Sequence, residues 1–184
     1  MKDNIRMLVT VGFLAVLSLM FLLAAISLNQ LHSINESMEN LVEVTNNKTA
    51  AANDMRDAIR LRSDSLKSMR LQEDIFDRDA EHQRFINHAR KYRIAREKLV
   101  SLGMDDNEAA LHEQLQQLTK ASQPHNDTAS EMLMSNAPVT EIDEVMEPAA
   151  TLQGLILGKL DEQVRFEQKN TEQALASSRR HDAG

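Results

Sequence analysis

The feature that most constrains this chain is a long stretch between Ser27 and Gly103 that contains neither proline nor glycine. From Leu31 to Phe76, seam positions alternate at spacings of three and four residues, and most of them are apolar. This spacing is typical of a long helix in a coiled coil or a bundle. Such a helix would be about 69 Å long, and it needs other long helices, or its twin in a dimer, to cover its apolar face.

Composition points to the same all-helical class and excludes several others. The 184 residues include five Gly and three Pro, whereas a β-sandwich or barrel needs a turn every ~8–12 residues. The sequence has no Cys, which excludes disulfides, cysteine-ligated metal centres and cysteine nucleophiles. It has no glycine-rich phosphate-binding loop, and its net charge of −7 argues against nucleic acid as a partner. We expect no cofactor.

The segment Met7–Leu28 predicts a transmembrane helix. Its 22 residues carry no charge and would span about 33 Å, enough for a hydrocarbon core of about 30 Å. Lys2 and Arg6 precede it, and no further Lys or Arg follows before Lys48. By the positive-inside rule, residues 1–6 are expected in the cytoplasm and the part of the chain after the membrane segment outside, which in a Gram-negative bacterium is the periplasm.

A cleaved signal peptide is the alternative interpretation of this segment, because Ala25-Ile26-Ser27 loosely fits a small-x-small cleavage site. The apolar stretch is longer than the ~7–15 residues usual for the core of a signal peptide, and this favours an uncleaved anchor in the inner membrane. The absence of Cys excludes a lipoprotein.

Turn signals divide the remaining sequence into further helices. Residues 77–79 are the first plausible turn, and Asp79 is the expected N-cap of a second helix over 80–102. Gly103 is expected to end that helix, as a glycine just past a helix C-terminus does, and residues 105–107 offer N-caps for a third helix.

The third helix is predicted over 108–135 and the fourth over 141–178. Pro124 falls inside the third helix and is expected to kink or interrupt it, whereas Pro148 falls in the second or third turn of the fourth helix and is expected to kink it without a break. Thr140 begins a sequence that resembles a capping box, so we expect it to cap the fourth helix.

The predicted architecture is a membrane helix that continues into an antiparallel up-down-up-down four-helix bundle, because short connections place successive helices side by side. The bundle is expected to cover 29–178, and 179–184 to form a juxtamembrane end where a second membrane helix could start. We therefore expect the chain to be the front part of a longer protein. From 167 to 173 the fourth helix presents a polar face, which we expect to be weakly packed unless a partner covers it.

Two local patterns are more specific than the general layout. One is Asn46-Asn47-Lys48 with Met55-Arg56-Asp57-Ala58-Ile59-Arg60, and the other is Val145-Met146-Glu147-Pro148-Ala149 near the start of the last helix. With the layout, they resemble the four-helix-bundle sensor domain of methyl-accepting chemotaxis proteins, a module that also precedes the output domains of some diguanylate cyclases and sensor kinases. The resemblance implies a homodimeric receptor that passes a helix shift across the inner membrane to an output module absent from this chain.

Arg56, Arg60 and Arg62 are the candidate ligand-binding residues. Arg56 and Arg60 share a helix face at a spacing of four, and the arginine fork suits a carboxylate or a phosphate. Arg62 occupies the apolar seam and therefore needs a buried partner or a ligand. The resemblance implies that small ligands bind between the first helices of two subunits. The alternative is that these arginines pair with Asp57, with Asp64 or with the acidic fourth helix.

For the other charged residues we favour structural roles. Lys48 and Glu73 occupy seam positions, where polar residues commonly fix register and partner number. The predicted second helix is basic and the fourth is acidic, which predicts complementary faces within one bundle; an anionic ligand site on the second helix is the alternative. The six His are scattered, so we expect no metal site, and His125 is expected to be a core histidine.

The sequence is compatible with two functions. The first is the ligand-sensing region of a bacterial transmembrane receptor that detects a small anionic molecule or a periplasmic binding protein. The second is a membrane-tethered periplasmic adaptor or assembly protein with no ligand of its own. The sequence contains no nucleophile elbow or other catalytic spacing, so we expect the chain itself not to be an enzyme, whereas a downstream output domain could be a cyclase or a kinase.

Overall fold

The computed structural model describes the backbone of residues 2–182 and the side chains at 12–13, 17–23, 26, 40–173 and 176. Its helices are α1 (Lys2–Leu71), α2 (Ile75–Ser101), α3 (Asp106–Met134) and α4 (Val139–Asp182). Residues 2–182 contain no strand, so the predicted all-helical class is confirmed.

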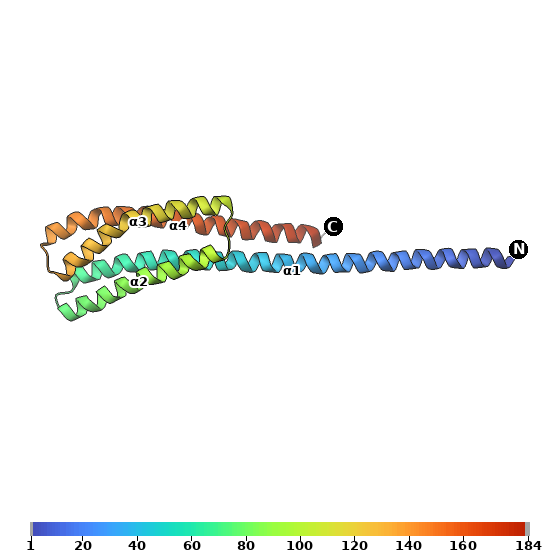
Figure 1. Cartoon of the computed structure of the whole chain (residues 1–184), viewed down its shortest axis with the longest axis horizontal. Helices are drawn as coiled ribbons and strands as arrows, with labels where there is room; N and C mark the ends of the chain where they lie inside the picture. The colour runs from blue at the N-terminus through green and yellow to red at the C-terminus, as the bar shows by residue number, and fades with distance from the viewer. Residues whose placement is uncertain (1, 183–184) are drawn as a thin grey trace.

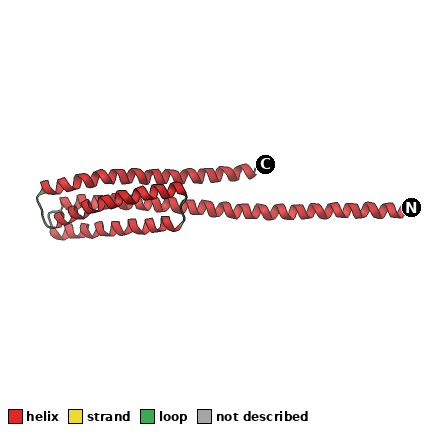
Figure 2. Cartoon of the chain, turned by 45° about the horizontal axis from the view of Figure 1, so that its top comes forward, coloured by secondary structure: helices red, strands yellow, loops and turns green. Residues whose placement is uncertain are grey.

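The helices lie side by side, and successive helices run in opposite directions (Figures 1 and 2). α1 packs against both α2 and α4, and α3 packs against α4, whereas α2 and α3 hardly touch each other. We call the part in which the four helices lie side by side the body. The body is closely packed from α2 to α1, from α1 to α4 and from α4 to α3, and it is open between α2 and α3. Both α1 and α4 continue beyond the body at the end that carries the α2–α3 connection (Figure 1).

Residues 7–28, the predicted membrane segment, form part of α1, and many of their side chains lie outside what the structure describes. The side chains of the predicted terminal segments 1–6 and 179–184 lie outside it as well. In the part of the chain that is described, no helix combines the length and the apolar character needed to cross a membrane.

Two apolar clusters form the core. The first is Ala51, Met55, Ala95, Leu99, Leu115, Ile156 and Leu160, and the second is Leu66, Met69, Phe85, Leu133 and Ile142. Each large apolar side chain buried in this way contributes roughly 1.5–3 kcal/mol. Of the residues that α1 provides, Met55, Leu66 and Met69 are predicted seam positions, whereas Ala51 lies next to one. The spacing of three and four therefore predicts most of the buried face of this helix.

The first connection lies earlier in the sequence than predicted. α1 ends at Leu71 rather than at Phe76, and the N-cap of α2 is Asp74 rather than Asp79. The Asp74 carboxylate accepts a hydrogen bond from the backbone N–H of Phe76 at 2.7 Å. Glu73 lies in the connection and is exposed, and Phe76 is 82% exposed. The prediction that both occupy seam positions is therefore wrong.

Arg78 stabilises the end of the body that carries the α1–α2 connection. Its guanidinium donates one hydrogen bond to the carbonyl of Gln72 at 2.7 Å and another to the carbonyl of Leu133 at 3.0 Å, and it also contacts the side-chain oxygen of Asn136. These bonds join the α1–α2 connection to the end of α3. Asn136 has a φ of 55°, the left-handed conformation that ends a helix sharply.

The connection between α2 and α3 matches its sequence signals. Gly103 has a φ of 79°, as expected for the glycine that follows a helix, and Asp105 caps α3. The Asp105 carboxylate accepts hydrogen bonds from the N–H groups of Asn107 and Glu108, both at 2.8 Å. The Glu108 carboxylate accepts one from the N–H of Asp105 at 2.7 Å, which completes a capping box.

The two interior prolines do not interrupt their helices. α3 continues through Pro124, and α4 continues through Pro148. α4 also begins one residue before Thr140, and the N–H of Glu141 bonds to the carbonyl of Pro138. Thr140 therefore lies within the first turn, and the prediction that it caps the helix is wrong.

Candidate functional site

Arg62 carries a guanidinium from α1 into the interior of the bundle. Its side chain is 16% exposed, and it lies over the ring of Phe85, with the guanidinium carbon 4.3 Å from the ring centre. Its Nη2 donates a hydrogen bond to the Asp127 carboxylate at 3.3 Å. Burial lowers the pKa of Arg62, and the negative charge of Asp127 opposes this effect. The expected partner of this seam arginine is therefore an acidic residue of α3.

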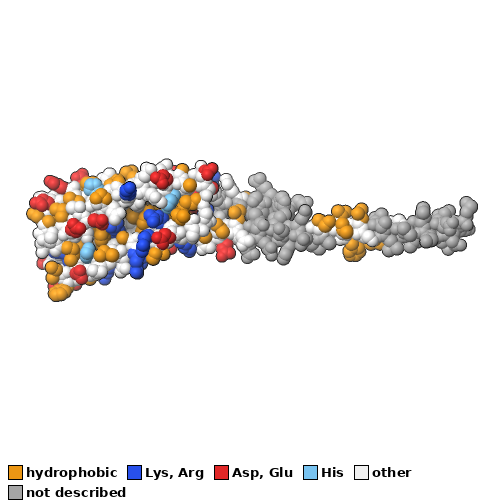
Figure 3. Space-filling model, viewed as in Figure 1, with side chains coloured by type: hydrophobic (Ala, Val, Ile, Leu, Met, Phe, Trp, Pro, Cys, Tyr) orange, Lys and Arg blue, Asp and Glu red, His pale blue; other side chains and the backbone are white. Residues whose placement is uncertain are grey.

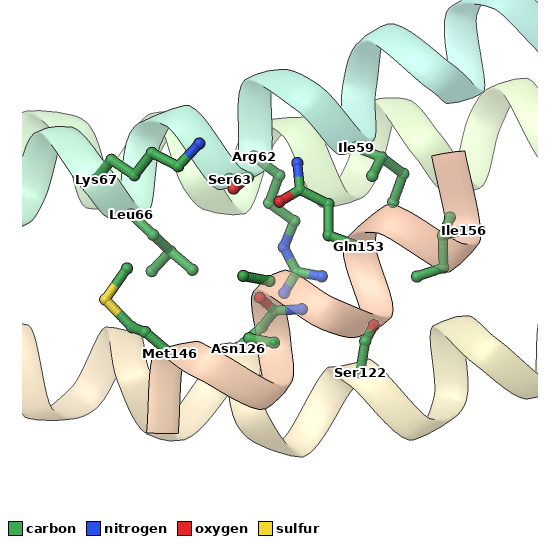
Figure 4. A pocket seen from close by; sticks show the side chains of 12 residues that line it. Ile59, Arg62, Ser63, Leu66, Lys67, Ser122, Asn126, Met146, Gln153 and Ile156 are labelled. Carbon is green, nitrogen blue, oxygen red and sulfur yellow. The ribbon is translucent and has the colours of Figure 1, made fainter. Parts of the chain in front are cut away.

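A small cavity of about 50 Å³ lies beside Arg62, between α1, α3 and α4. In Figure 4 the Arg62 guanidinium points into this space toward Asn126, with Ser122 and Gln153 close by. The rest of the lining is mostly apolar, including Met146. A volume of this size accommodates a few water molecules and no organic ligand.

The other two candidate arginines lie elsewhere. Arg56 donates a hydrogen bond to the Asp161 carboxylate at 3.1 Å and so joins α1 to α4. Arg60 is exposed, and it forms no ion pair with any residue whose side chain is described. The structure thus does not bring Arg56, Arg60 and Arg62 together within one chain, and among the three it is Arg62 that lines a cavity. A shared role in ligand binding remains a prediction.

Lys48, a second charged seam residue that is largely buried, pairs with Glu108. Its Nζ lies 2.8 Å from both carboxylate oxygens of Glu108, and the two side chains are 13% and 2% exposed. Glu108 is also the capping-box residue of α3, so its carboxylate receives the Asp105 N–H in addition. The Lys48 ammonium and the N-terminus of α3 therefore both bind the Glu108 carboxylate.

A third helix completes this cluster through Gln163 and Glu167 of α4, each 1% exposed. Gln163 donates a hydrogen bond to Glu167 at 2.7 Å, and the Glu167 carboxyl group lies close to that of Glu108. Burial raises the pKa of Glu167 to about 7, and its hydrogen bond to Glu108 and the negative charge of Glu108 act in the same direction. Gln163 and Lys48 act in the opposite direction.

The sequence prediction missed this buried cluster. Residues 167–173 were expected to be a weakly packed polar face, yet Glu167 is as buried as the apolar core. The available signal was the spacing, because Gln163 and Glu167 continue the pattern of Ile156 and Leu160 along one face of α4. The expectation is therefore wrong for Glu167, whereas Gln168 and Lys169 are exposed.

The predicted pairing of a basic second helix with an acidic fourth helix is also wrong. α4 directs its acidic residues to α1, as in the pairs Arg56–Asp161 and Arg70–Asp143. No ion pair joins α2 to α4 among the described side chains, and these two helices are not neighbours. Most of the positive charge of α2 is therefore left without carboxylate partners within the described part of the bundle.

The histidines do not form a metal site in the described part of the chain. There, no three side chains of His, Asp or Glu come together as metal ligands would. His125 is half-buried. His112 is buried, and its Nε2 lies 2.9 Å from the side-chain nitrogen of Gln116.

Comparison with known proteins gives a fold relationship. No family model matches the chain, and no curated protein sequence matches it either. A solved structure described as the periplasmic sensor domain of a sensor histidine kinase is similar, with a TM-score of 0.68 and 14% identity. The match covers 77% of this chain and 94% of that domain. The chain therefore shares the fold of a periplasmic sensor domain, whereas function has to be argued from its own residues.

Proposed function

We propose that this chain is the extracytoplasmic sensing region of a bacterial transmembrane receptor, and that it is not itself catalytic. The observation that carries the proposal is the fold match, which extends over 94% of a periplasmic sensor domain. The layout supports it, because α1 and α4 both leave the body at one end (Figure 1). Two long helices thereby transmit a change in the packing of the body toward the end at which they leave it.

The anchor proposed for this receptor is residues 7–28 in the inner membrane, with the N-terminus in the cytoplasm and the bundle in the periplasm. The uncharged sequence and the preceding Lys2 and Arg6 support this topology. Large apolar side chains of this part of α1, such as Phe13, Met20 and Phe21, are exposed by more than half. A run of exposed apolar surface of this kind requires lipid or another protein to cover it.

The signalling step proposed is a small sliding or rotation of α1 against α4. Packed helix interfaces have discrete arrangements, so a ligand that favours one of them shifts the helices by a step. Arg56–Asp161 and Arg70–Asp143 are the ion pairs that join the two helices along their length. The Lys48–Glu108–Glu167 cluster ties both helices to α3 near the end from which they leave.

Cross-linking between introduced cysteines tests this step. Because the sequence has no native Cys, the cross-linker reacts with the introduced thiols of this chain and with no other. The paired variants R56C with D161C and R70C with D143C are made in the chain fused to a second membrane helix and a reporter kinase. With a flexible bismaleimide, the yield at one pair should change relative to the other when a ligand alters the kinase output. Unchanged yields alongside a changed output contradict the sliding mechanism. A membrane-tethered adaptor without a ligand predicts no change in either readout.

We also propose that the receptor is a homodimer joined along α1. Leu41 and Leu61 of this helix are 49% and 45% exposed, which leaves apolar area outside the monomer core. The mass of the detergent-solubilised chain measured by light scattering tests this, and it should correspond to two copies. Replacing Leu61 by Asp should reduce that mass to one copy, whereas a dimeric L61D variant contradicts the proposed interface.

A further inference from the structure

The open side of the bundle forms a groove. It lies between α2 and α3, has α1 as its floor and has a volume of about 610 Å³, within the range of small-molecule sites. Ala89, Tyr92, Arg93 and Arg96 lie on the α2 wall at spacings of three and four, so they share one helix face. From residue 89 to residue 96 this face extends over about 10 Å, the length of a small organic molecule.

The groove is strongly positive. Its lining includes five cationic side chains and, among the residues described there, no acidic one: Arg62, Arg90, Arg93, Arg96 and Lys120. Figure 3 shows Lys and Arg side chains near the middle of the body on the face in view, with Asp and Glu side chains beside them. The chain as a whole carries a net charge of −7, so this concentration of positive charge is local. Its field favours entry of anions into the groove.

The groove cations of α2 and α3 are also unpaired within the described part of the chain. No carboxylate lies within ion-pair distance of Arg90, Arg93, Arg96 or Lys120 there. Arg90, Arg93 and Arg96 lie within seven residues of one helix and repel one another, and no ion pair among the described side chains offsets this repulsion. The positive charge of Arg96 also contributes, after burial, to the lowered pKa of His112.

Two buried polar atoms of the lining, the Tyr92 hydroxyl and Nε of Arg62, form no hydrogen bond of good geometry with the described residues. The Thr119 side chain lies close enough to the Tyr92 hydroxyl to lower the pKa of Tyr92, whereas burial raises it. Buried polar groups are almost always satisfied, so a water or a ligand with acceptor atoms is expected at this place. Arg62 lines both the groove and the small interior cavity beside α4, and it thereby connects the groove with the helix that leaves the body.

Building on the sensing role above, we propose that the α2–α3 groove binds a small organic anion with two or more negative groups, such as a dicarboxylate or a phosphate ester. Arg93 and Arg96 on one wall and Lys120 on the other bind the charged groups, because guanidinium and ammonium groups match carboxylate and phosphate oxygens. The Tyr92 hydroxyl donates a hydrogen bond to the anion. The site lies within one chain and uses α2 and α3.

The experiment uses the full chain in a nonionic detergent, with citrate, succinate and inorganic phosphate as probes and with glycerol and spermidine as controls. Tyr92 is the only Tyr and the sequence has no Trp, so intrinsic tyrosine emission reports from the groove itself. Titration calorimetry and this emission should both detect at least one of the anions and neither control. The affinity should fall as the salt concentration rises, because the charged groups of the groove are screened.

Charge-removing variants locate the site. R93Q, R96Q and K120Q should each weaken anion binding by about tenfold or more, the usual loss for a charge-assisted hydrogen bond. R84Q is the matched control, because Arg84 lies on the same helix, pairs with Glu81 and does not line the groove. Lys120 is exposed, so K120Q tests the site even where an arginine variant fails to fold.

Three results would overturn the proposal. In one, none of the three anions binds; in another, the groove variants bind them as tightly as R84Q does. In the third, R93Q and R96Q change the oligomeric state while anion binding stays intact, so the groove is an interface with the acidic surface of a second copy.

The sensing role is tested separately by the output of the reporter fusion. Anion binding without any output response would contradict that role alone, and an output response to a non-anionic compound would contradict the groove site alone.

Discussion

The Glu167 carboxyl group of α4 lies close to the Glu108 carboxylate of α3, and both side chains are at most 2% exposed. Two carboxylates buried together do not both ionise at low cost, so one proton is retained between them. Lys48 and the Asp105 N–H bind Glu108, which leaves Glu167 as the group that holds the proton. The contact between α3 and α4 near the end of the body therefore depends on pH.

The first prediction concerns this pH dependence. The pKa of Glu167 is raised from 4.5 to about 7, so between these values the folded chain holds a proton that the unfolded chain has lost. The stability contributed by protonated Glu167 is full below about pH 4.5 and is lost as the pH rises through about 7. E167Q, which stays neutral, should exceed the parent in unfolding free energy at pH 8 by on the order of 2 kcal/mol.

Urea unfolding of both proteins between pH 5 and pH 8 provides the measurement. The difference between them is the quantity to follow, since His88 and His112 have lowered pKa values and act in the opposite direction within this range. For these histidines, stability is lost as the pH falls. A difference that stays constant across the range means that Glu167 does not hold the proton.

The second prediction concerns the ion pair between Lys48 and Glu108. Replacing Lys48 by Met leaves the Glu108 carboxylate buried without its cation, and this should destabilise the chain by about 3–5 kcal/mol. Lys67, which is exposed and pairs with Asp64 at 3.5 Å, is the matched control, and K67M should change stability by less than about 1 kcal/mol. Thermal unfolding monitored by circular dichroism distinguishes the two. Similar losses of stability for both variants would show that the buried Lys48–Glu108 pair contributes no more to stability than the exposed Lys67–Asp64 pair.

Sequence periodicity predicted the helices because each buried face is a local property of its own segment. Met55 and Leu66 on α1, and Gly103 at the second connection, were identified from spacing and capping chemistry alone, and Asp105 was one of three candidate N-caps. The end of α1 was misplaced because Glu73 continues the spacing although the chain has already turned there.

The candidate site was harder to predict because it depends on which helices are neighbours. Charge composition suggested that α2 pairs with α4, whereas α4 packs on α1 and α3 and leaves α2 and α3 apart. The groove lined by Arg93, Arg96 and Lys120 exists because of that gap, and no local pattern encodes it. The buried position of Glu167 likewise requires Glu108 and Lys48, which lie far away in the sequence.

The third prediction compares two glycines. Gly103 has a φ of 79°, a conformation that strains an L-residue, so G103A should destabilise the chain by about 1 kcal/mol. Gly158 lies inside α4, and a Cβ there meets nothing within 4 Å. G158A should therefore stabilise the chain by roughly 0.5–1 kcal/mol through helix propensity. The midpoints of urea unfolding should move in opposite directions, and a shift of the same sign for both contradicts this assignment of backbone conformations.

The last prediction separates the two parts of the Arg62 environment. Asp127 is about half exposed, so D127N removes an ion pair that water already screens and should cost less than about 1 kcal/mol. R62M removes the same pair together with the cation over the Phe85 ring, so its cost should exceed that of D127N by about 0.5–2 kcal/mol. In the F85L background this excess should shrink, because the ring face has gone. A double-mutant cycle on unfolding free energies measures the coupling. Zero coupling between Arg62 and Phe85 would mean that the ion pair with Asp127 alone holds the guanidinium in the interior.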